Sequence, residues 1–321
     1  MEYVAGIDGG GTKTVAVITG TDGNVEAKAT AGPVNPNVIT KKELYQTLSD
    51  LVQDLRKQNK AAFEQITYFF AGISGAGNDN AVQLLSEMLA GLVPEKTRVQ
   101  VEPDTVNALY SGTYGEPGIV QISGTGSITF GINANGKRDR TGGWGYLFGD
   151  EGSGYDIGRS GIIAALKAYD GRDKDTVLLE MVCNHFRIGN PYNLIQEIYA
   201  SKSPKSDISP VSKLVFDAYR QHDAAAEEII KDTVMELSCS IRTLKAKLYR
   251  PEEAVQVVLC GGVFADKAVL PKLLQEELQD DRQLTIIIPE MPPAGGSVIG
   301  ALLMKNIKPD ESIIQNIITT Y

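Results

Sequence analysis

The spacing of apolar and polar positions predicts alternating strands and helices. Two apolar, β-branched runs flank a glycine-rich stretch near the N-terminus and predict two strands joined by a turn. A third strand is expected over 24–31, and leucines then recur at helical spacing from Leu44 to Leu55. Thr40 and Glu43 have the spacing of a capping box at the start of that helix. Two further strands alternate with helices, so the first part of the chain is predicted to be a mixed α/β sheet.

The second part of the chain repeats this beginning. Residues 119–132 again read as strand, glycine-hydroxyl turn and strand, which indicates an internal duplication. Residues 156–250 are nearly all helical by pattern, and strands return at 255–259 and 284–288. The sequence therefore predicts an α/β protein of two lobes, with a helical insertion at about 156–250 in the second.

The lobes are expected at 1–116 and 117–295. The remaining residues, 296–321, begin within a helix whose apolar face is expected to pack back on the N-terminal lobe.

The composition of the chain argues against several classes of function. A net charge of -9 argues against a nucleic-acid partner, because there is no basic excess to neutralise phosphates. No apolar run approaches the ~20 residues that span a bilayer, and no signal peptide is recognisable, so no membrane partner is expected. The 3 cysteines are widely spaced, which fits a reducing, cytoplasmic location. With only 2 histidines, a histidine base is not expected.

The first glycine turn has the chemistry of an anion site. Three glycines after Asp8 allow a backbone that approaches a ligand closely, and the hydroxyls of Thr12 and Thr14 are expected as further donors. Asp8 is placed to hold a divalent cation, directly or through water. The stretch is not a P-loop, because Thr12 stands where lysine is needed and a strand follows. The alternative is an ordinary glycine-rich β-turn.

Polar residues also follow the next two parallel strands. Asp8, Ser74 and Asp104 all fall at carboxyl ends of strands, where ligands of such sheets bind. Asp104 could serve as a base for a hydroxyl that accepts a phosphoryl group. The alternative for Asp104 is a helix N-cap.

Four glycine-rich segments, taken in order, resemble the actin-like ATPase superfamily of sugar kinases, chaperone ATPases and actin. They are Asp8-Gly-Gly-Gly-Thr12, Ser123-Gly-Thr-Gly-Ser127, the pair Gly142-Gly-Trp-Gly145 and Gly149-Asp-Glu-Gly-Ser153, and Gly261-Gly262. Within the superfamily the chain resembles the BadF/BadG/BcrA/BcrD-type ATPases and, more narrowly, their N-acetylglucosamine kinases. The resemblance covers essentially the whole chain.

This resemblance implies two actin-like (ribonuclease H-like) lobes that close over ATP, Mg²⁺ and a sugar. The implied activity is transfer of the γ-phosphoryl group to a hydroxyl, with the 6-OH expected, of an amino sugar such as N-acetylglucosamine or N-acetylmuramic acid. Such an activity belongs to amino-sugar metabolism and cell-wall recycling. Homodimers are common in the family.

The family's functional positions carry over by motif. Asp104 would be the catalytic base, and Asp8 would orient Mg²⁺ through water. The nucleotide would be held by Gly10, Gly11, Thr12, Lys13, Gly124, Thr125 and Gly126, with Gly261 and Gly262 beneath the adenosine. The sugar would be held by Asn35, Ser74, Asp104, Gly143, Trp144, Gly145 and Asp150. Asn37 is an alternative to Asn35, which we favour.

Two other functions are compatible with the resemblance. An iron–sulfur activator ATPase of a 2-hydroxyacyl-CoA dehydratase needs cysteines just beyond the second hairpin, and residues 123–182 contain none. A non-catalytic sugar-sensing protein would need a DNA-binding module, whereas this chain starts directly with the first strand.

Overall fold

The computed structural model describes residues 2–321, which form two compact units. The first unit comprises Met1–Gly118 and Pro289–Tyr321, and the second comprises Ile119–Ile288. The C-terminal part of the first unit thus begins at Pro289, earlier than the expected residue 296.

The first unit is built on a five-stranded sheet of order β3-β2-β1-β4-β5. Its strands are β1 (Tyr3–Gly9), β2 (Thr14–Gly20), β3 (Val25–Ala31), β4 (Ile66–Ile73) and β5 (Arg98–Glu102). β2 is antiparallel to both of its neighbours, β1 and β3, whereas β4 lies parallel to β1 and β5 parallel to β4. The carboxyl ends of β1, β4 and β5 therefore meet at one edge.

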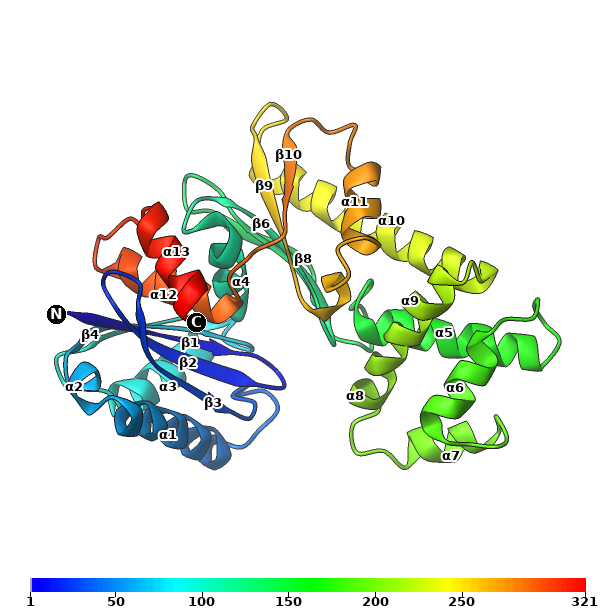
Figure 1. Cartoon of the computed structure of the whole chain (residues 1–321), viewed down its shortest axis with the longest axis horizontal. Helices are drawn as coiled ribbons and strands as arrows, with labels where there is room; N and C mark the ends of the chain where they lie inside the picture. Colours follow the sequence, from blue (N-terminus) through cyan, green and yellow to red (C-terminus); the bar gives the residue numbers. More distant parts are fainter. Residues whose placement is uncertain (1) are drawn as a thin grey trace. The chain divides into compact units, whose positions relative to one another are not determined.

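Helices cover both faces of this sheet (Figure 1). They are α1 (Lys41–Gln58), α2 (Lys60–Phe63), α3 (Asp79–Ala90), α4 (Asp104–Thr113), α12 (Pro293–Met304) and α13 (Glu311–Thr320). The capping box of Thr40 and Glu43 is present at the start of α1. α1 and α3 bury leucines against one face, while α12 and α4 pack together over the other.

Glycines allow α12 to lie very close to its neighbours. A Cβ on Gly6 of β1 would stand 2.2 Å from the Ser297 Oγ, and one on Gly296 would stand 2.0 Å from the carbonyl oxygen of Asn107. Distances this short leave no room for a side chain on either glycine. This packing fixes α4 over the middle of the sheet.

The second unit contains a sheet of order β10-β9-β6-β7-β8. Its strands are β6 (Gly118–Ser123), β7 (Ser127–Ile132), β8 (Arg138–Gly142), β9 (Val255–Cys260) and β10 (Leu284–Ile287). The strand β8 was not expected from the sequence, because Arg138, Asp139 and Arg140 give it no apolar alternation. It lies at the sheet edge, where charged strands are common.

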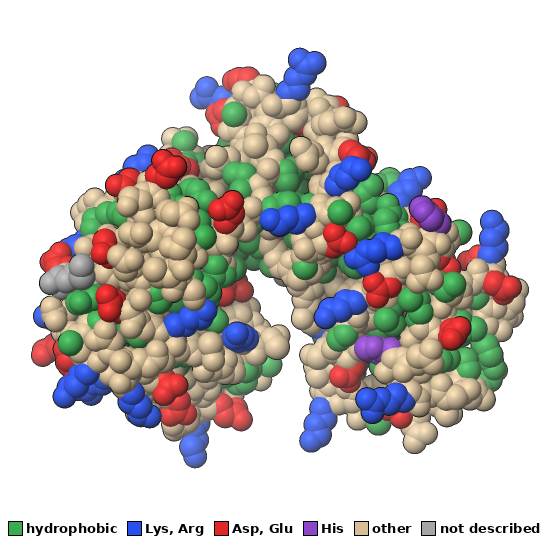
Figure 2. Space-filling model, in the orientation of Figure 1, with side chains coloured by type: hydrophobic (Ala, Val, Ile, Leu, Met, Phe, Trp, Pro, Cys, Tyr) green, Lys and Arg blue, Asp and Glu red, His purple; other side chains and the backbone are tan. Residues whose placement is uncertain are grey.

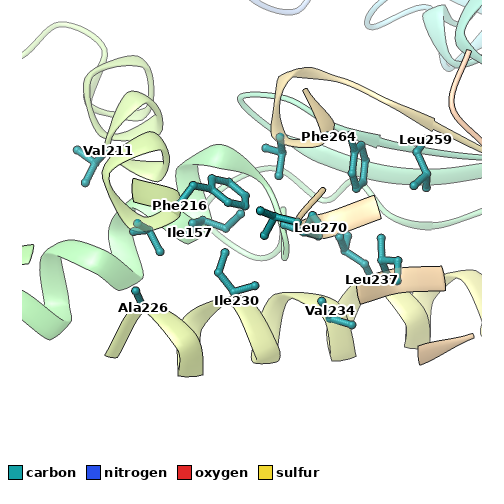
Figure 3. Close-up of a cluster of buried hydrophobic side chains, with 14 of the residues drawn as sticks. Ile157, Val211, Phe216, Ala226, Ile230, Val234, Leu237, Leu259, Phe264 and Leu270 are labelled. Atoms are coloured by element: carbon teal, nitrogen blue, oxygen red, sulfur yellow. The ribbon is translucent and has the colours of Figure 1, made fainter. Parts of the chain in front are cut away.

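Helices pack around the second sheet and build most of this unit (Figure 1). They are α5 (Gly154–Tyr169), α6 (Leu178–Phe186), α7 (Asn193–Tyr199), α8 (Pro204–Ile208), η1 (Ser209–Val211), α9 (Ser212–Arg220), α10 (Ala224–Leu248), η2 (Gly262–Phe264) and α11 (Leu270–Glu277). Ile230 and Leu237 of α10 point toward Phe264 and Leu270, so helices and sheet share one core (Figure 3).

On the face drawn in Figure 2, basic side chains are interspersed with acidic ones. Among the described residues, no helix is long and apolar enough to cross a membrane.

Candidate functional site

In the first unit, three polar residues meet at the carboxyl edge of the parallel strands, as their sequence positions predict. Asp8 lies near the end of β1, Ser74 directly follows β4, and Asp104 follows β5 as the first residue of α4. The backbone N–H of Ser74 donates to the carbonyl of Gly9 at 2.7 Å, which ties the ends of two strands together. The N-cap of α4 is Pro103 rather than Asp104, so helix capping does not account for Asp104.

A chain of hydrogen bonds leads to the Asp104 carboxylate. The Ser74 hydroxyl donates to this carboxylate, and the Asn35 Nδ2 donates to the Ser74 Oγ at 3.3 Å. The Asn35 Oδ1 accepts from the backbone N–H of Asn37 at 2.9 Å, which fixes the Asn35 amide. Of the two candidate asparagines, Asn35 is thus the one joined to Ser74.

Both carboxyl groups at this edge bind their protons more tightly than usual. Burial, and then the charge of Asp8, raise the pKa of Asp104 to about 7, although hydrogen bonds from Thr105 and Ser74 oppose the shift. Burial raises the pKa of Asp8 to about 6 against a hydrogen bond from Asn107. Two poorly solvated carboxylates close together favour a proton or a cation between them.

Asn107 is a contributor to this site that sequence reasoning missed. Its fully buried amide directs Nδ2 toward three oxygens, the Ile7 carbonyl at 3.0 Å, Asp8 Oδ1 at 2.9 Å and the Gly72 carbonyl at 3.2 Å. The amide fits only because Gly72 lacks a side chain, since a Cβ there would lie 2.3 Å from it. The available signal was its spacing, three residues after Asp104 and hence on the same helix face.

The first hairpin presents an exposed turn. Gly10 N–H donates to the Lys13 carbonyl at 3.0 Å, and Gly11, Thr12 and Lys13 are exposed. The expectation that the Thr14 hydroxyl serves a ligand was wrong. Thr14 is fully buried, and its hydroxyl donates to the Gly32 carbonyl at 2.7 Å.

In the second unit, the second hairpin rests on Gly261. Gly124 N–H donates to the Gly126 carbonyl at 2.9 Å, which closes the turn. Gly261 has φ +108°, and a Cβ there would stand 2.2 Å from the carbonyl oxygen of Ser123. Only glycine allows this conformation and this approach.

A cavity of about 560 Å³ lies beside the second hairpin, within the second unit. Three predicted nucleotide residues line it, Gly124, Thr125 and Gly262. The remaining wall comes from α5, η1, α9 and the segment after β9, namely Gly154, Ser209, Pro210, Ser212, Lys213, Phe216, Asp217, Arg220, Val263, Ala265 and Asp266. Gly154, at the N-terminus of α5, adds the positive end of a helix dipole. Sequence motifs did not reveal the α9 wall.

The predicted sugar loop follows β8. Trp144 is 68% exposed, and the guanidinium of Arg140 lies 4.3 Å from its ring centroid. Gly143 and Gly145 on either side have positive φ angles of 69° and 81°.

Asp150 lies further along the same segment, against the second hairpin, and a Cβ on the preceding Gly149 would stand 3.3 Å from the Trp144 Cβ. Asp150 is 4% exposed; its Oδ1 accepts from the backbone N–H of Ser127 at 3.2 Å, and its Oδ2 accepts from the Lys205 Nζ at 2.7 Å. Lys205 is a second residue that sequence reasoning missed.

Magnesium fits the acidic edge of the first unit. Among residues 2–321, no group of three or more His, Cys, Asp or Glu is arranged to hold a metal ion. Mg²⁺ typically uses only one or two carboxylates together with waters and substrate phosphates, and Asp8 with Asp104 offers that donor set. Among the described residues, the three cysteines, Cys183, Cys239 and Cys260, form no disulfide.

Comparison with known proteins agrees with this architecture. Residues 5–304 match the BadF/BadG/BcrA/BcrD ATPase family, and the chain belongs to that family. It is 35% identical to an N-acetylmuramic acid/N-acetylglucosamine kinase of Clostridium acetobutylicum, over 82% of this chain and 86% of the relative. It is 28% identical to an N-acetyl-D-glucosamine kinase of Dictyostelium discoideum, over 95% of this chain and 99% of the relative.

Solved structures show the same fold. A protein of Chromobacterium violaceum, provisionally named N-acetylglucosamine kinase, superposes with a TM-score of 0.76 at 25% identity, over 94% of this chain and 99% of the other. A ROK family glucokinase of Streptomyces griseus, solved with glucose and AMPPNP, gives a TM-score of 0.57 at 15% identity, over 94% of this chain and 98% of the other. The expected actin-like sugar-kinase fold is thereby confirmed.

Proposed function

We propose that this protein is an ATP-dependent kinase that transfers the γ-phosphoryl group to the 6-OH of an amino sugar such as N-acetylglucosamine or N-acetylmuramic acid. The observation that carries the proposal is the position of Asp104, beside a second carboxylate and at the end of the Asn35–Ser74 hydrogen-bond chain. The activities named for the two relatives support the substrate class.

Asp104 acts as the general base in this proposal. A base works best with a pKa near the working pH, and the pKa of Asp104 is about 7. Its carboxylate takes the proton of the accepting hydroxyl as the oxygen attacks the γ-phosphorus and the bond to the leaving ADP oxygen breaks. Ser74 and Asn35 orient the carboxylate and offer hydrogen bonds to the sugar.

The nucleotide is assigned to the glycine hairpins and to the cavity beside the second one. The turns closed by the Gly10 and Gly124 N–H groups leave the backbone N–H groups of Gly11 to Lys13 and of Thr125 and Gly126 to face phosphates. The cavity beside Phe216 has room for the adenosine, with Gly262 in its wall. Mg²⁺, held by Asp8 through water, would neutralise charge on the phosphates.

The sugar is assigned to Asn35, Ser74 and Asp104 in the first unit and to Gly143, Trp144, Gly145 and Asp150 in the second. An exposed indole between two glycines offers a flat apolar face for a sugar ring. Carboxylate and amide groups supply the hydrogen bonds that pyranose hydroxyls need.

The test is the substitution Asp104→Asn, assayed by ADP release over a panel of amino sugars. We expect turnover to fall at least ~100-fold, because the general base is lost. Asp79→Asn is the matched control, since Asp79 is also the first residue of a helix in this unit but is exposed. Phosphorus NMR of the product identifies the phosphorylated hydroxyl.

Other outcomes would replace the proposal. Stoichiometric iron and sulfide in anaerobically purified protein would favour the activator ATPase. Saturable sugar binding without any phosphorylated product would favour a sugar-sensing protein.

A further inference from the structure

We propose that Lys205 is a phosphate-binding residue of the second hairpin, supplied by the helical region. This inference rests on the proposed nucleotide site. The Lys205 Nζ lies 2.7 Å from the Asp150 Oδ2 and 2.9 Å from where a Cβ on Gly126 would stand. The ammonium group therefore touches the turn that carries Gly124 and Thr125.

Packing of α8 against α5 fixes this position. A Cβ on Gly158 would lie 2.4 Å from the Ile208 carbonyl oxygen, so α8 approaches α5 backbone to backbone. Ser209 directly follows α8 and lines the cavity, as does Gly154 at the start of α5. Lys205 lies about one helical turn before Ser209, and the same backbone contact thus sets both the cavity wall and the lysine.

Charge explains why a lysine is needed there. Asp150 is 4% exposed, and its carboxylate lies against the hairpin through the Ser127 N–H. An unpaired carboxylate at this place would repel nucleotide phosphates and would itself be costly to bury. The ion pair with Lys205 removes both effects.

The Lys205 ammonium group has more hydrogen-bond donors than its ion pair uses. An ammonium group carries three N–H donors, of which the Asp150 Oδ2 accepts one. The side chain of Lys205 is 28% exposed, so a ligand above the turn can reach it. Phosphates that run from the cavity along Gly124–Gly126 meet this ammonium group, which then binds phosphate and Asp150 together.

The first experiment measures nucleotide binding without sugar, by calorimetry. For Lys205→Met we expect affinity for AMPPNP to fall about tenfold or more, since a charge-assisted hydrogen bond is lost. Affinity for AMP should change little, and Lys205→Arg should retain most of the AMPPNP affinity. Lys202→Met is the control, because Lys202 is exposed in the same segment. Equal AMPPNP affinity of Lys205→Met and the wild type would overturn the inference.

A second variant separates phosphate binding from charge cancellation. Asp150→Asn/Lys205→Met leaves no unpaired buried charge, so it should fold even where the single lysine variant does not. If Lys205 binds phosphate, the double variant still binds AMPPNP weakly. If the lysine only neutralises Asp150, affinity returns to the wild-type value and the inference is wrong. Wild-type protein that binds AMPPNP yet phosphorylates no sugar would contradict the proposed kinase while leaving this inference standing.

Discussion

Asp8 adds to the effect of burial in raising the pKa of Asp104 to about 7. Asp8 itself has a pKa of about 6, because burial outweighs its hydrogen bond from Asn107. Both folded-state pKa values exceed 3.8, the ordinary pKa of an aspartate. The stabilising contribution of these protons is therefore complete below pH 3.8 and is lost as the pH rises through 6 to 7. The folded protein is therefore less stable at neutral pH, where the Asp104 carboxylate is able to accept a proton.

The first prediction concerns the pH dependence of activity. A base with a pKa of about 7 is protonated and inactive at lower pH, so kcat/KM should rise with pH up to about 7 and then level off. Carbon-detected NMR titration of metal-free protein should show a lower Asp104 pKa in Asp8→Asn, because one negative charge is gone. A flat kcat/KM profile between pH 5 and 8 would contradict Asp104 as the base.

The second prediction concerns stability. At pH 8 both carboxylates are charged in the wild type, whereas Asp104→Asn removes one of them. We expect the variant to melt about 2–4 °C higher at pH 8, as a gain of roughly 1 kcal/mol would produce. At pH 5 Asp104 is neutral in the folded wild type but ionised in the unfolded chain, so the difference should shrink, and it should vanish only below pH 3.8. A lower melting temperature at both pH values would show that the charged carboxylate is structurally required.

The third prediction concerns Ser74. Its hydrogen bond favours the ionised form of Asp104, so Ser74→Ala should raise the pKa of Asp104 further. The rise of kcat/KM should then shift to higher pH, with a larger loss at pH 6 than at pH 8. An equal loss at every pH would mean that Ser74 serves the substrate and leaves the base unchanged.

The edge of the first sheet could be predicted because it follows from strand order. Asp8 and Ser74 lie at strand ends and Asp104 lies two residues after one, and parallel pairing brings those ends together. The role of Asn107 did not follow from strand order, because its contacts depend on how closely α4 approaches Gly72. That approach is a tertiary property, set by the packing of α12.

In the second unit, too, contacts between residues far apart in the sequence could not be predicted from local patterns. Lys205 lies 55 residues from Asp150 in the sequence, and no local pattern joins them. The charged edge strand β8 has no apolar alternation. The Thr14 hydroxyl follows the glycine turn in sequence, yet it donates to the Gly32 carbonyl, 18 residues away. Sequence patterns predicted local turns and strand ends. Contacts with residues of helices that are distant in the sequence became visible only in the structure.

The fourth prediction concerns the fit of Asn107 against Gly72. Gly72→Ala would place a Cβ 2.3 Å from the buried amide, so we expect a loss of about 1–3 kcal/mol in the free energy of unfolding. Gly77→Ala is the control, because nothing lies within 4 Å of its Cβ position. Denaturant titration measures both. Adding Asn107→Ala to Gly72→Ala should relieve the clash, so the double variant should lose less than the sum of the two single losses.

The last prediction concerns Trp144, the single tryptophan of the chain. Its ring is 68% exposed and lies under the Arg140 guanidinium, 4.3 Å from the ring centroid. A sugar ring bound against the indole would displace water from it, so emission should shift to shorter wavelength and saturate as amino sugar is added. Mannitol at equal concentration controls for solvent effects, and Trp144→Phe should abolish the signal. If no amino sugar that the enzyme phosphorylates changes the emission, Trp144 does not belong to the sugar site. A sugar ring bound against so exposed an indole would change the solvation of the indole and hence its emission.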